Sequence, residues 1–271
     1  MHSTASDGVY SPPEVVGLAI KHQMDVIALT DHDNVDGIAP AQLAAANTSL
    51  RVLAGVELSS EDDAADRHVL GYLVDTTYVP LLDKLRQLQN ARIERVQQIA
   101  AKLAAINRPI SVERVLELAG EGSVGRPHIA RAMVEAGHVN SIQDAFNRYI
   151  GDDGAAYVPH SRLTPSEAIQ MIHAAGGVAV LAHPGHYGDY RAIIEALIPL
   201  GLDGVEVFYY DHSSTVITEL QSIARHHDLL MTVGSDFHRR EPDGSARIGS
   251  VHVPAKLPIV EAMEVRAARY R

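Results

Sequence analysis

The sequence contains no cysteine and no tryptophan, and it has only three phenylalanines in 271 residues. Without cysteine the protein cannot form disulfides, zinc–thiolate sites or iron–sulfur clusters. No apolar run approaches the roughly 20 residues that a helix needs to cross a bilayer. The first residues also lack the basic segment and apolar core of a secretory signal. We therefore expect a cytoplasmic protein that does not contact a membrane.

Basic residues are also scarce: 23 lysines and arginines stand against 34 aspartates and glutamates, which gives a formal net charge of −11 at pH 7. Long nucleic acid needs a broad basic surface, so this balance argues against such a partner. A small phosphorylated substrate is still compatible, because bound cations can supply a positive field locally. The length and the apolar fraction of 46% suit one barrel-type domain, or a core domain with an insertion.

Short apolar runs alternate with helical stretches at both ends of the chain. Strands are predicted at 26–29, 51–56, 68–74, 178–182, 204–208 and 230–233, and helices at 11–22, 39–46, 164–176 and 214–227. Repeated strand–helix units predict a parallel sheet with right-handed crossovers, either open or closed into a barrel. In both arrangements the ligand site lies at the carboxyl ends of the strands.

The middle of the chain differs from both ends. Between Pro80 and Ile106, apolar residues recur at helical spacing. Further helices are predicted at 111–119, 126–136 and 141–149. Almost nothing from residue 78 to residue 155 is typical of a strand. The sequence therefore predicts a helical insertion over 78–155, within a discontinuous barrel domain of residues 1–77 and 156–271.

Histidines and acids gather just past the predicted strand ends. These residues are His32, Glu57, His183, Asp236 and His238. Asp236 and His238 alternate along an extended segment, so their side chains point the same way and can bind adjacent metals. Neutral imidazole and carboxylate hold divalent metals side by side, and such centres typically hydrolyse phosphate esters. Taken singly, a motif could instead be a helix cap or a structural histidine; together they favour a metal centre.

An ordered series of motifs carries a resemblance to a known family. The series runs from His2 through Asp7-Gly8, Thr30-Asp31-His32, Gly55-Val56-Glu57, Arg67-His68, Gly125-Arg126-Pro127-His128, Ala182-His183-Pro184-Gly185 and Gly234-Ser235-Asp236-Phe237-His238. It resembles the polymerase-and-histidinol-phosphatase (PHP) domain over nearly the whole chain. The similarity is greatest to bacterial phosphoesterases that act on nucleoside 3′,5′-bisphosphates and short oligoribonucleotides. The resemblance implies an α/β fold, a distorted seven-stranded (β/α) barrel.

The resemblance also implies three metal positions. The first would use His2, Glu57, Asp236 and one further histidine; the second Glu57, His68 and His183; the third Asp7, His32 and His238. Two or three divalent ions are expected, with manganese favoured and iron, zinc or magnesium as alternatives. The family's first motif is His-x-His, and Met1 stands at its middle position. We therefore expect the first histidine and the first barrel strand to lie upstream of this chain.

Two acids beside the ligands each have two interpretations. Asp31 either orients His32 by a hydrogen bond or caps a helix. Glu206 either supports a metal ligand or is a carboxylate at the edge of the core.

Basic residues are candidates for contact with phosphate. By resemblance Arg126 and His128 reach over the metals to hold phosphate, and arginine suits bidentate contact with its oxygens. The alternative is that they belong to a solvated helix start. His186 occupies a place where family members often have a basic residue, so it is a third candidate. Arg92 and Arg95, on the long predicted helix, either line the same cleft or are exposed, and we expect them to be exposed.

The resemblance implies hydrolysis of a phosphate monoester on a small substrate, a nucleotide or a short oligoribonucleotide. We expect the reaction to remove the 3′-phosphate of nucleoside 3′,5′-bisphosphates through a hydroxide that bridges two metals, without a side-chain nucleophile. Two alternatives on the same scaffold are 5′–3′ exonuclease action on short RNA and hydrolysis of histidinol phosphate. An alternative of a different class is a non-catalytic PHP module that has lost its metals.

Overall fold

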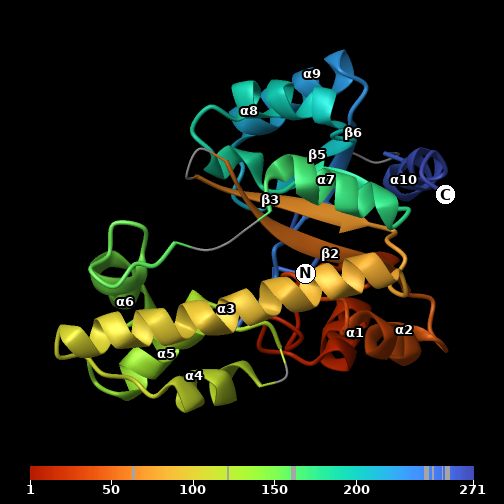
Figure 1. Cartoon of the computed structure of the whole chain (residues 1–271). Helices are drawn as coiled ribbons and strands as arrows, with labels where there is room; N and C mark the ends of the chain where they lie inside the picture. Colours follow the sequence, from red (N-terminus) through yellow and green to blue (C-terminus); the bar gives the residue numbers. More distant parts are fainter. Residues whose placement is uncertain are drawn as a thin grey trace.

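A six-stranded sheet in the order β1 to β6 curls into a half-barrel, and helices pack around it (Figure 1). The computed structural model describes residues 1–62, 65–120, 122–159, 163–240, 244–245, 247–251, 253 and 257–271. The strands are β1 (Val26–Leu29), β2 (Arg51–Asp62), β3 (Ala65–Tyr72), β4 (Val178–Leu181), β5 (Gly204–Tyr209) and β6 (Leu230–Gly234). The mixed α/β architecture confirms the predicted fold class.

Helices account for most of the remaining regular structure. They are α1 (Pro12–Lys21), α2 (Ile38–Ala45), α3 (Val79–Ala105), α4 (Val112–Ala119), α5 (Arg126–Glu135), α6 (Ile142–Ala145), α7 (Pro165–Ala174), α8 (Tyr190–Leu197), α9 (Ser214–His226) and α10 (Ile259–Ala267). Among the helices that the structure describes, none is long and apolar enough to cross a membrane.

The prediction of a parallel sheet is wrong for β3, which runs antiparallel to both of its neighbours, β2 and β4. The other neighbouring strands, β1 with β2, β4 with β5 and β5 with β6, are parallel. The connection explains the difference. β2 ends at Asp62 and β3 begins at Ala65, which leaves no room for a crossover helix, so the chain turns back on itself.

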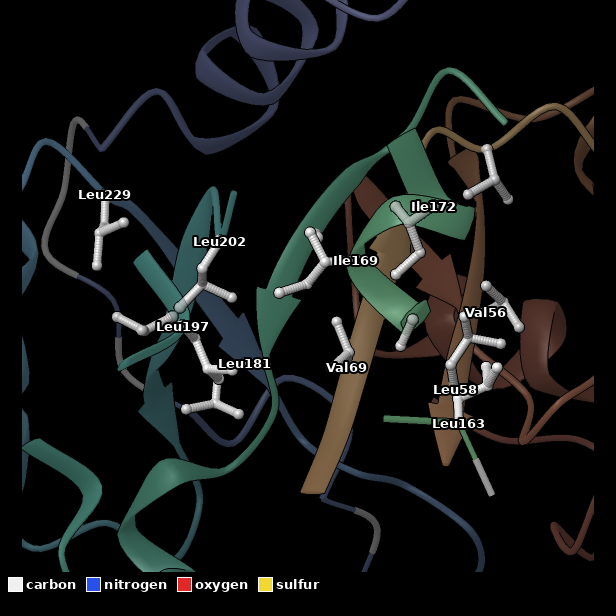
Figure 2. Close-up of a cluster of buried hydrophobic side chains, with 14 of the residues drawn as sticks. Val56, Leu58, Val69, Leu163, Ile169, Ile172, Leu181, Leu197, Leu202 and Leu229 are labelled. Carbon is white, nitrogen blue, oxygen red and sulfur yellow. The ribbon is translucent and has the colours of Figure 1, made fainter. Parts of the chain in front are cut away.

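The core between the sheet and α7 fixes the register of β2 and β3. Val56 and Leu58 of β2 belong to the same buried cluster as Val69 of β3 and Ile169 of α7 (Figure 2). Successive residues of a strand point to opposite faces, so Glu57 faces away from this core. If β2 paired one residue out of register, Val56 and Leu58 would leave the core and Glu57 would point into it. Apolar packing on one face of β2 therefore positions a carboxylate on the other.

Helix α3 connects two separate hydrophobic clusters. Its first turns place Leu81, Leu85 and Leu88 in the core beside the sheet. Its later turns place Val96 and Leu103 in a second cluster, which is shared with α4 and α5. In Figure 1 these shorter helices lie along the far half of α3, away from the strands. The helical segment thus has a hydrophobic core of its own.

The first residues of the chain lie between the ends of β1 and β6. The N–H of Thr30 donates to the carbonyl of Met1 at 2.9 Å, and the N–H of His2 donates to the carbonyl of Phe237 at 2.9 Å. These bonds hold His2 beside the carboxyl ends of the two outermost strands. The barrel strand expected upstream of Met1 stays a prediction; the described sheet has six strands.

We predict that Leu103→Ala lowers the free energy of unfolding by about 2–5 kcal/mol, because the truncation leaves a cavity in the second cluster. Urea unfolding followed by circular dichroism measures the change. Leu43→Ala is the matched control, since Leu43 is exposed on α2 and its truncation should change stability by less than about 0.5 kcal/mol. Equal losses in the two variants would contradict the packing described for α3.

Candidate metal centre

The predicted metal ligands all converge at one end of the half-barrel. Their donor atoms form three groups, in each of which every atom lies within 4.8 Å of the others. The groups are His2, Asp7, His32 and His238; His32, Glu57 and His68; and His2, Glu57 and Asp236. The group of His2, Glu57 and Asp236 contains the residues of this chain that are expected at the first metal position. The group of His2, Asp7, His32 and His238 contains the three ligands expected at the third metal position, with His2 in addition. The group of His32, Glu57 and His68 matches the second metal position except that it contains His32 and not His183.

Glu57 lies at the centre of the cluster and faces ligands on two sides. Its Oε1 lies 2.6 Å from Nδ1 of His68 and 3.4 Å from Nε2 of His183. Its Oε2 lies 3.0 Å from Nε2 of His2. The side chain is buried, so both oxygens are directed to ligand atoms and not to solvent. One carboxylate can therefore be shared by two adjacent cations.

Two further carboxylates lie beside His2 and His238. Oδ1 of Asp236 is 3.2 Å from Nε2 of His2, and Oδ1 of Asp7 is 3.2 Å from Nε2 of His238. The hydroxyl of Tyr209 donates to Oδ2 of Asp236 at 3.0 Å and orients that carboxylate. The rings of His2 and His238 stack with their centroids 4.0 Å apart. Oxygen and nitrogen donors thus surround the same small space, as they do in sites for divalent transition metals.

His183 is held by its neighbours in a left-handed backbone conformation, with φ of 30° and ψ of 53°. Such a conformation costs roughly 1–3 kcal/mol in a residue other than glycine. Oε2 of Glu206 accepts a hydrogen bond from the N–H of His183 at 2.8 Å, and burial raises the pKa of Glu206 to about 7. Glu206 therefore fixes the backbone of His183, a candidate ligand, and its role beside a metal stays a prediction. The ring of His186 lies 5.3 Å from that of His183.

Asp31 anchors the N-terminal loop. Its Oδ1 accepts hydrogen bonds from the N–H of Ser3 at 2.7 Å and from the hydroxyl of Ser6 at 2.6 Å, and its Oδ2 accepts from the hydroxyl of Ser3 at 2.8 Å. Both oxygens are engaged in this way, so among the described residues Asp31 neither bonds to the ring of His32 nor caps a helix. Neither of its expected roles is seen. Asp31 instead fixes the loop that presents the two N-terminal ligands.

The charges of the cluster suit divalent cations. Burial lowers the pKa of His32 to about 4, so its ring is neutral at pH 7. Burial alone would raise the pKa of Glu57. The neighbouring histidines, among which His32 has the largest effect, outweigh burial and hold the pKa of Glu57 well below its usual value. Nδ1 of His32 and of His183 are buried without a hydrogen-bond partner among the described residues. Burial lowers the pKa of His2, but hydrogen bonds with Asp236 and Glu57 outweigh burial and raise that pKa to about 10, so a cation bound there would displace a proton. Neutral imidazoles and ionised carboxylates are the forms that bind metal, and this set of donors fits a divalent centre.

Asp33 is a site residue that reasoning from the sequence misses. It is buried, with φ of 48°, and its N–H donates to the carbonyl of Glu57 at 3.0 Å. Its Oδ1 accepts from the N–H of Ser59 at 3.0 Å, and its Oδ2 accepts from Nε of Arg92 at 2.9 Å. Asp33 therefore ties the loop after β1 to β2 and to α3, next to His32. Its position in the Thr-Asp-His-Asp run is the one available signal.

The expectation that Arg92 and Arg95 are exposed is wrong. The side chain of Arg92 is 13% exposed, and Arg95 is 8% exposed. The reason lies in their partners: Arg92 forms an ion pair with the buried Asp33, and Nε of Arg95 donates to the carbonyl of Val158 at 2.8 Å.

Arg126 and His128, two of the three candidates for phosphate contact, lie at the start of α5. Nη1 of Arg126 donates to Oδ1 of Asp152 at 2.7 Å, and its Nη2 lies 3.6 Å from Oδ2 of Asp66. His128 is buried, and its Nδ1 accepts from the N–H of Gly125 at 3.0 Å. His128 thus caps the helix, which agrees with its alternative interpretation as part of a helix start, although the cap is buried and not solvated.

We predict that Asp33→Asn lowers the free energy of unfolding by about 3–5 kcal/mol, because it leaves the guanidinium of Arg92 buried without its charged partner. Urea unfolding of the metal-free protein measures the loss. Asp36→Asn, at an exposed position in the same loop, is the control and should change stability by less than about 0.5 kcal/mol. A loss no larger than the control's would show that the ion pair does not support the loop.

Comparisons with known proteins identify the family. The PHP domain model matches residues 1–150. The 5′-3′ exoribonuclease Rnm of Escherichia coli (strain K12) is 35% identical over 247 residues, which cover 89% of this chain and 84% of that relative. The 3′,5′-nucleoside bisphosphate phosphatase of Chromobacterium violaceum is 32% identical over 275 residues, 99% of this chain and 96% of that relative. The crystal structure of a candidate metal-dependent phosphoesterase from Bifidobacterium adolescentis has a TM-score of 0.87 and 29% identity, over 98% of this chain and 94% of that one. The chain therefore belongs to the PHP domain family, and it is a metal-dependent hydrolase of phosphate esters.

Proposed function

We propose that the protein hydrolyses the 3′-phosphate of nucleoside 3′,5′-bisphosphates. The observation that carries the proposal is the position of the Glu57 carboxylate. Its Oε1 faces His68 and His183, and its Oε2 faces His2. A carboxylate shared in this way suits adjacent cations, which many phosphoesterases use. Divalent ions, manganese first and iron, zinc or magnesium as alternatives, would supply Lewis acidity and acidify a bound water.

The residues that would hold the ions form three overlapping sets. They are His2, Glu57 and Asp236; Glu57, His68 and His183; and Asp7, His32 and His238. Glu206 holds the backbone of His183, and Tyr209 holds the carboxylate of Asp236, so both ligands keep one orientation. We propose no side-chain nucleophile, because ions held by these residues would supply an activated water in its place.

Arg126 is proposed to bind the phosphate that reacts. Its partner Asp152 is exposed, and exposed ion pairs contribute little to stability. A phosphate group can therefore replace Asp152 and accept two parallel hydrogen bonds from the guanidinium. His186, beside His183, is proposed to contact the same phosphate. His128 contributes by capping the helix that carries Arg126.

Residues 78–155 are proposed to cover the site of a barrel domain formed by residues 1–77 and 156–271. The support is that the helical segment has its own hydrophobic cluster and that its arginines pair with Asp33 and Asp66, close to the metal ligands. A covered site suits a nucleotide or a short oligoribonucleotide. The net charge of −11 disfavours long nucleic acid. The lack of cysteine supports a cytoplasmic location.

A second candidate is 5′–3′ exonuclease action on short RNA, which the 35% identity to the Escherichia coli relative of that name favours. Both activities cleave a phosphate ester of a ribonucleotide, so the same metal cluster serves either. Hydrolysis of histidinol phosphate is a third candidate on the same cluster. A non-catalytic module is set aside, because the expected ligands of this chain gather in one site.

We predict that the protein with Mn²⁺ releases phosphate from adenosine 3′,5′-bisphosphate with a kcat/KM roughly tenfold or more above that for histidinol phosphate, which lacks the groups such a site would bind. A chelator should abolish the release, and added Mn²⁺ should restore it. The measurement is a phosphate-release assay with the two substrates in parallel. Turnover of histidinol phosphate alone would contradict the proposed substrate. Faster, progressive release of mononucleotides from a 5′-phosphorylated RNA oligomer would favour the second candidate.

We also predict that Glu57→Gln lowers kcat/KM at least about 100-fold and reduces the number of bound ions, since losing even a partner of a metal ligand costs 10–100-fold. Metal analysis of the purified variant and the phosphate-release assay measure both effects. Glu94→Gln, at an exposed position of α3, is the matched control and should retain full activity. Full metal content and full activity in Glu57→Gln would rule out a shared carboxylate.

A further inference from the structure

The turn after β4, residues 182–186, carries the candidate ligand His183 and is held at both of its ends. We call it the His183 turn. Its backbone is left-handed at His183, with φ of 30°, and continues into a short 3-10 helix. A residue other than glycine keeps such a conformation only when its surroundings over-determine it. Glu206 accepts from the N–H of His183 at one end, and His212 accepts from the N–H of Gly185 at the other.

The imidazole of His212 bridges the His183 turn and β5. Its Nε2 lies 3.0 Å from the backbone nitrogen of Gly185, and its Nδ1 lies 3.0 Å from the carbonyl oxygen of Val207. A carbonyl oxygen can only accept, so Nδ1 carries the ring proton and Nε2 is the acceptor. The side chain is buried, and burial lowers the pKa of His212. The neutral ring is therefore fixed in one tautomer and one orientation.

Gly185 leaves the space that this ring occupies. A Cβ atom at position 185 would lie 2.6 Å from Cδ2 and 2.7 Å from Nε2 of His212, well inside the separation at which carbon atoms pack. The next atom, Cγ1 of Val216, would lie farther away, at 3.2 Å. The backbone of Gly185 does not itself require glycine, because its φ is not positive. The glycine of the Ala-His-Pro-Gly motif thus fits the imidazole of His212.

His212 also packs against the residue that orients a second candidate ligand. Its ring centroid lies 5.1 Å from that of Tyr209, and the hydroxyl of Tyr209 donates to Oδ2 of Asp236 at 3.0 Å. Among the described residues, His212 belongs to none of the groups that could hold a metal, and both of its nitrogens bond to backbone groups. It can therefore act on the metal centre only through its neighbours.

We propose that His212 is a positioning residue of the metal centre, which holds the His183 turn in place through its contact with Gly185. The contact keeps Nε2 of His183 directed at Oε1 of Glu57, 3.4 Å away. Without it, the strained turn can relax, and an ion must then order His183 as it binds. The inference rests on the proposed function only in that His183 binds a metal, and it does not depend on the substrate.

Isothermal titration calorimetry of the metal-free protein with Mn²⁺ tests this role without catalysis. His212→Ala should weaken at least one Mn²⁺ binding step roughly tenfold or more, as loss of a group that orients a ligand does. His212→Gln keeps an acceptor for the N–H of Gly185, so it should bind with intermediate affinity, and it serves if His212→Ala does not fold. His226→Ala is the matched control, because His226 is exposed at the end of α9, and it should bind like wild type. Wild-type Mn²⁺ affinity in both His212 variants would overturn the role.

A double-mutant cycle distinguishes this contact from a general effect on the fold. Gly185→Ala should by itself weaken Mn²⁺ binding roughly tenfold, because the added methyl group displaces the ring of His212. In the His212→Ala background the methyl group meets no ring, so the double variant should bind about as weakly as either single variant. If His212→Ala does not fold, His212→Gln takes its place in the cycle. Losses that multiply, to roughly 100-fold, would show that the two residues act independently and would overturn the proposal.

The titration also separates this inference from the proposed function. Failure of wild type to bind Mn²⁺ would contradict the metal centre and would overturn the role of His212 with it. Binding of Mn²⁺ by wild type without turnover of adenosine 3′,5′-bisphosphate would contradict the proposed substrate alone, and the affinities of the variants would still decide the role of His212.

Discussion

The buried carboxylate of Glu57 is the constraint on which the rest of the site depends. A charged group that is 2% exposed destabilises the fold unless other charges or hydrogen bonds compensate it. The backbone fixes its place, because the N–H of Glu57 donates to the carbonyl of Asp31 and the carbonyl of Glu57 accepts from Asp33. The histidines around it provide part of the compensation. Divalent cations would add to this compensation, because they bind neutral imidazoles together with ionised carboxylates.

The antiparallel direction of β3 places a further candidate ligand beside Glu57. His68 lies near the start of its strand, and in a parallel strand that position would be at the amino end of the sheet, far from the other ligands. Because β3 runs antiparallel, His68 pairs with Ser59, two residues beyond Glu57 on β2. Since Glu57 itself pairs with Leu70, His68 lies diagonally across from Glu57 within the β2–β3 pair. His68 begins its predicted strand, whereas His32 and His183 come after theirs. This difference is a signal in the sequence that β3 runs opposite to its neighbours.

The features that could be predicted from the sequence are the ones with local signals. The strands β1, β4 and β6 are short and largely apolar, and His32, His183 and Asp236 follow them closely, so strand polarity brings these residues together. β2 instead continues to Asp62, so Glu57 lies inside the strand and not past its end as the sequence predicts. The contacts of Asp33 and Asp31 could not be predicted in this way. Arg92 is 59 residues from Asp33 in the chain, and nothing in either motif specifies the pairing. An arginine on a helix is ordinarily exposed, and burial of Arg92 and Arg95 results from packing that joins distant segments.

The carboxylates of the candidate metal centre and the arginines of the helical segment carry opposite charges. Without cations, the carboxylates of Asp7, Glu57 and Asp236 repel any phosphate. Divalent cations held by these residues would offset that repulsion. Arg92 and Arg126, on the helical segment, pair with Asp33 and Asp66 of the half-barrel. These two ion pairs therefore link the helical segment to the half-barrel on the side of the candidate metal ligands.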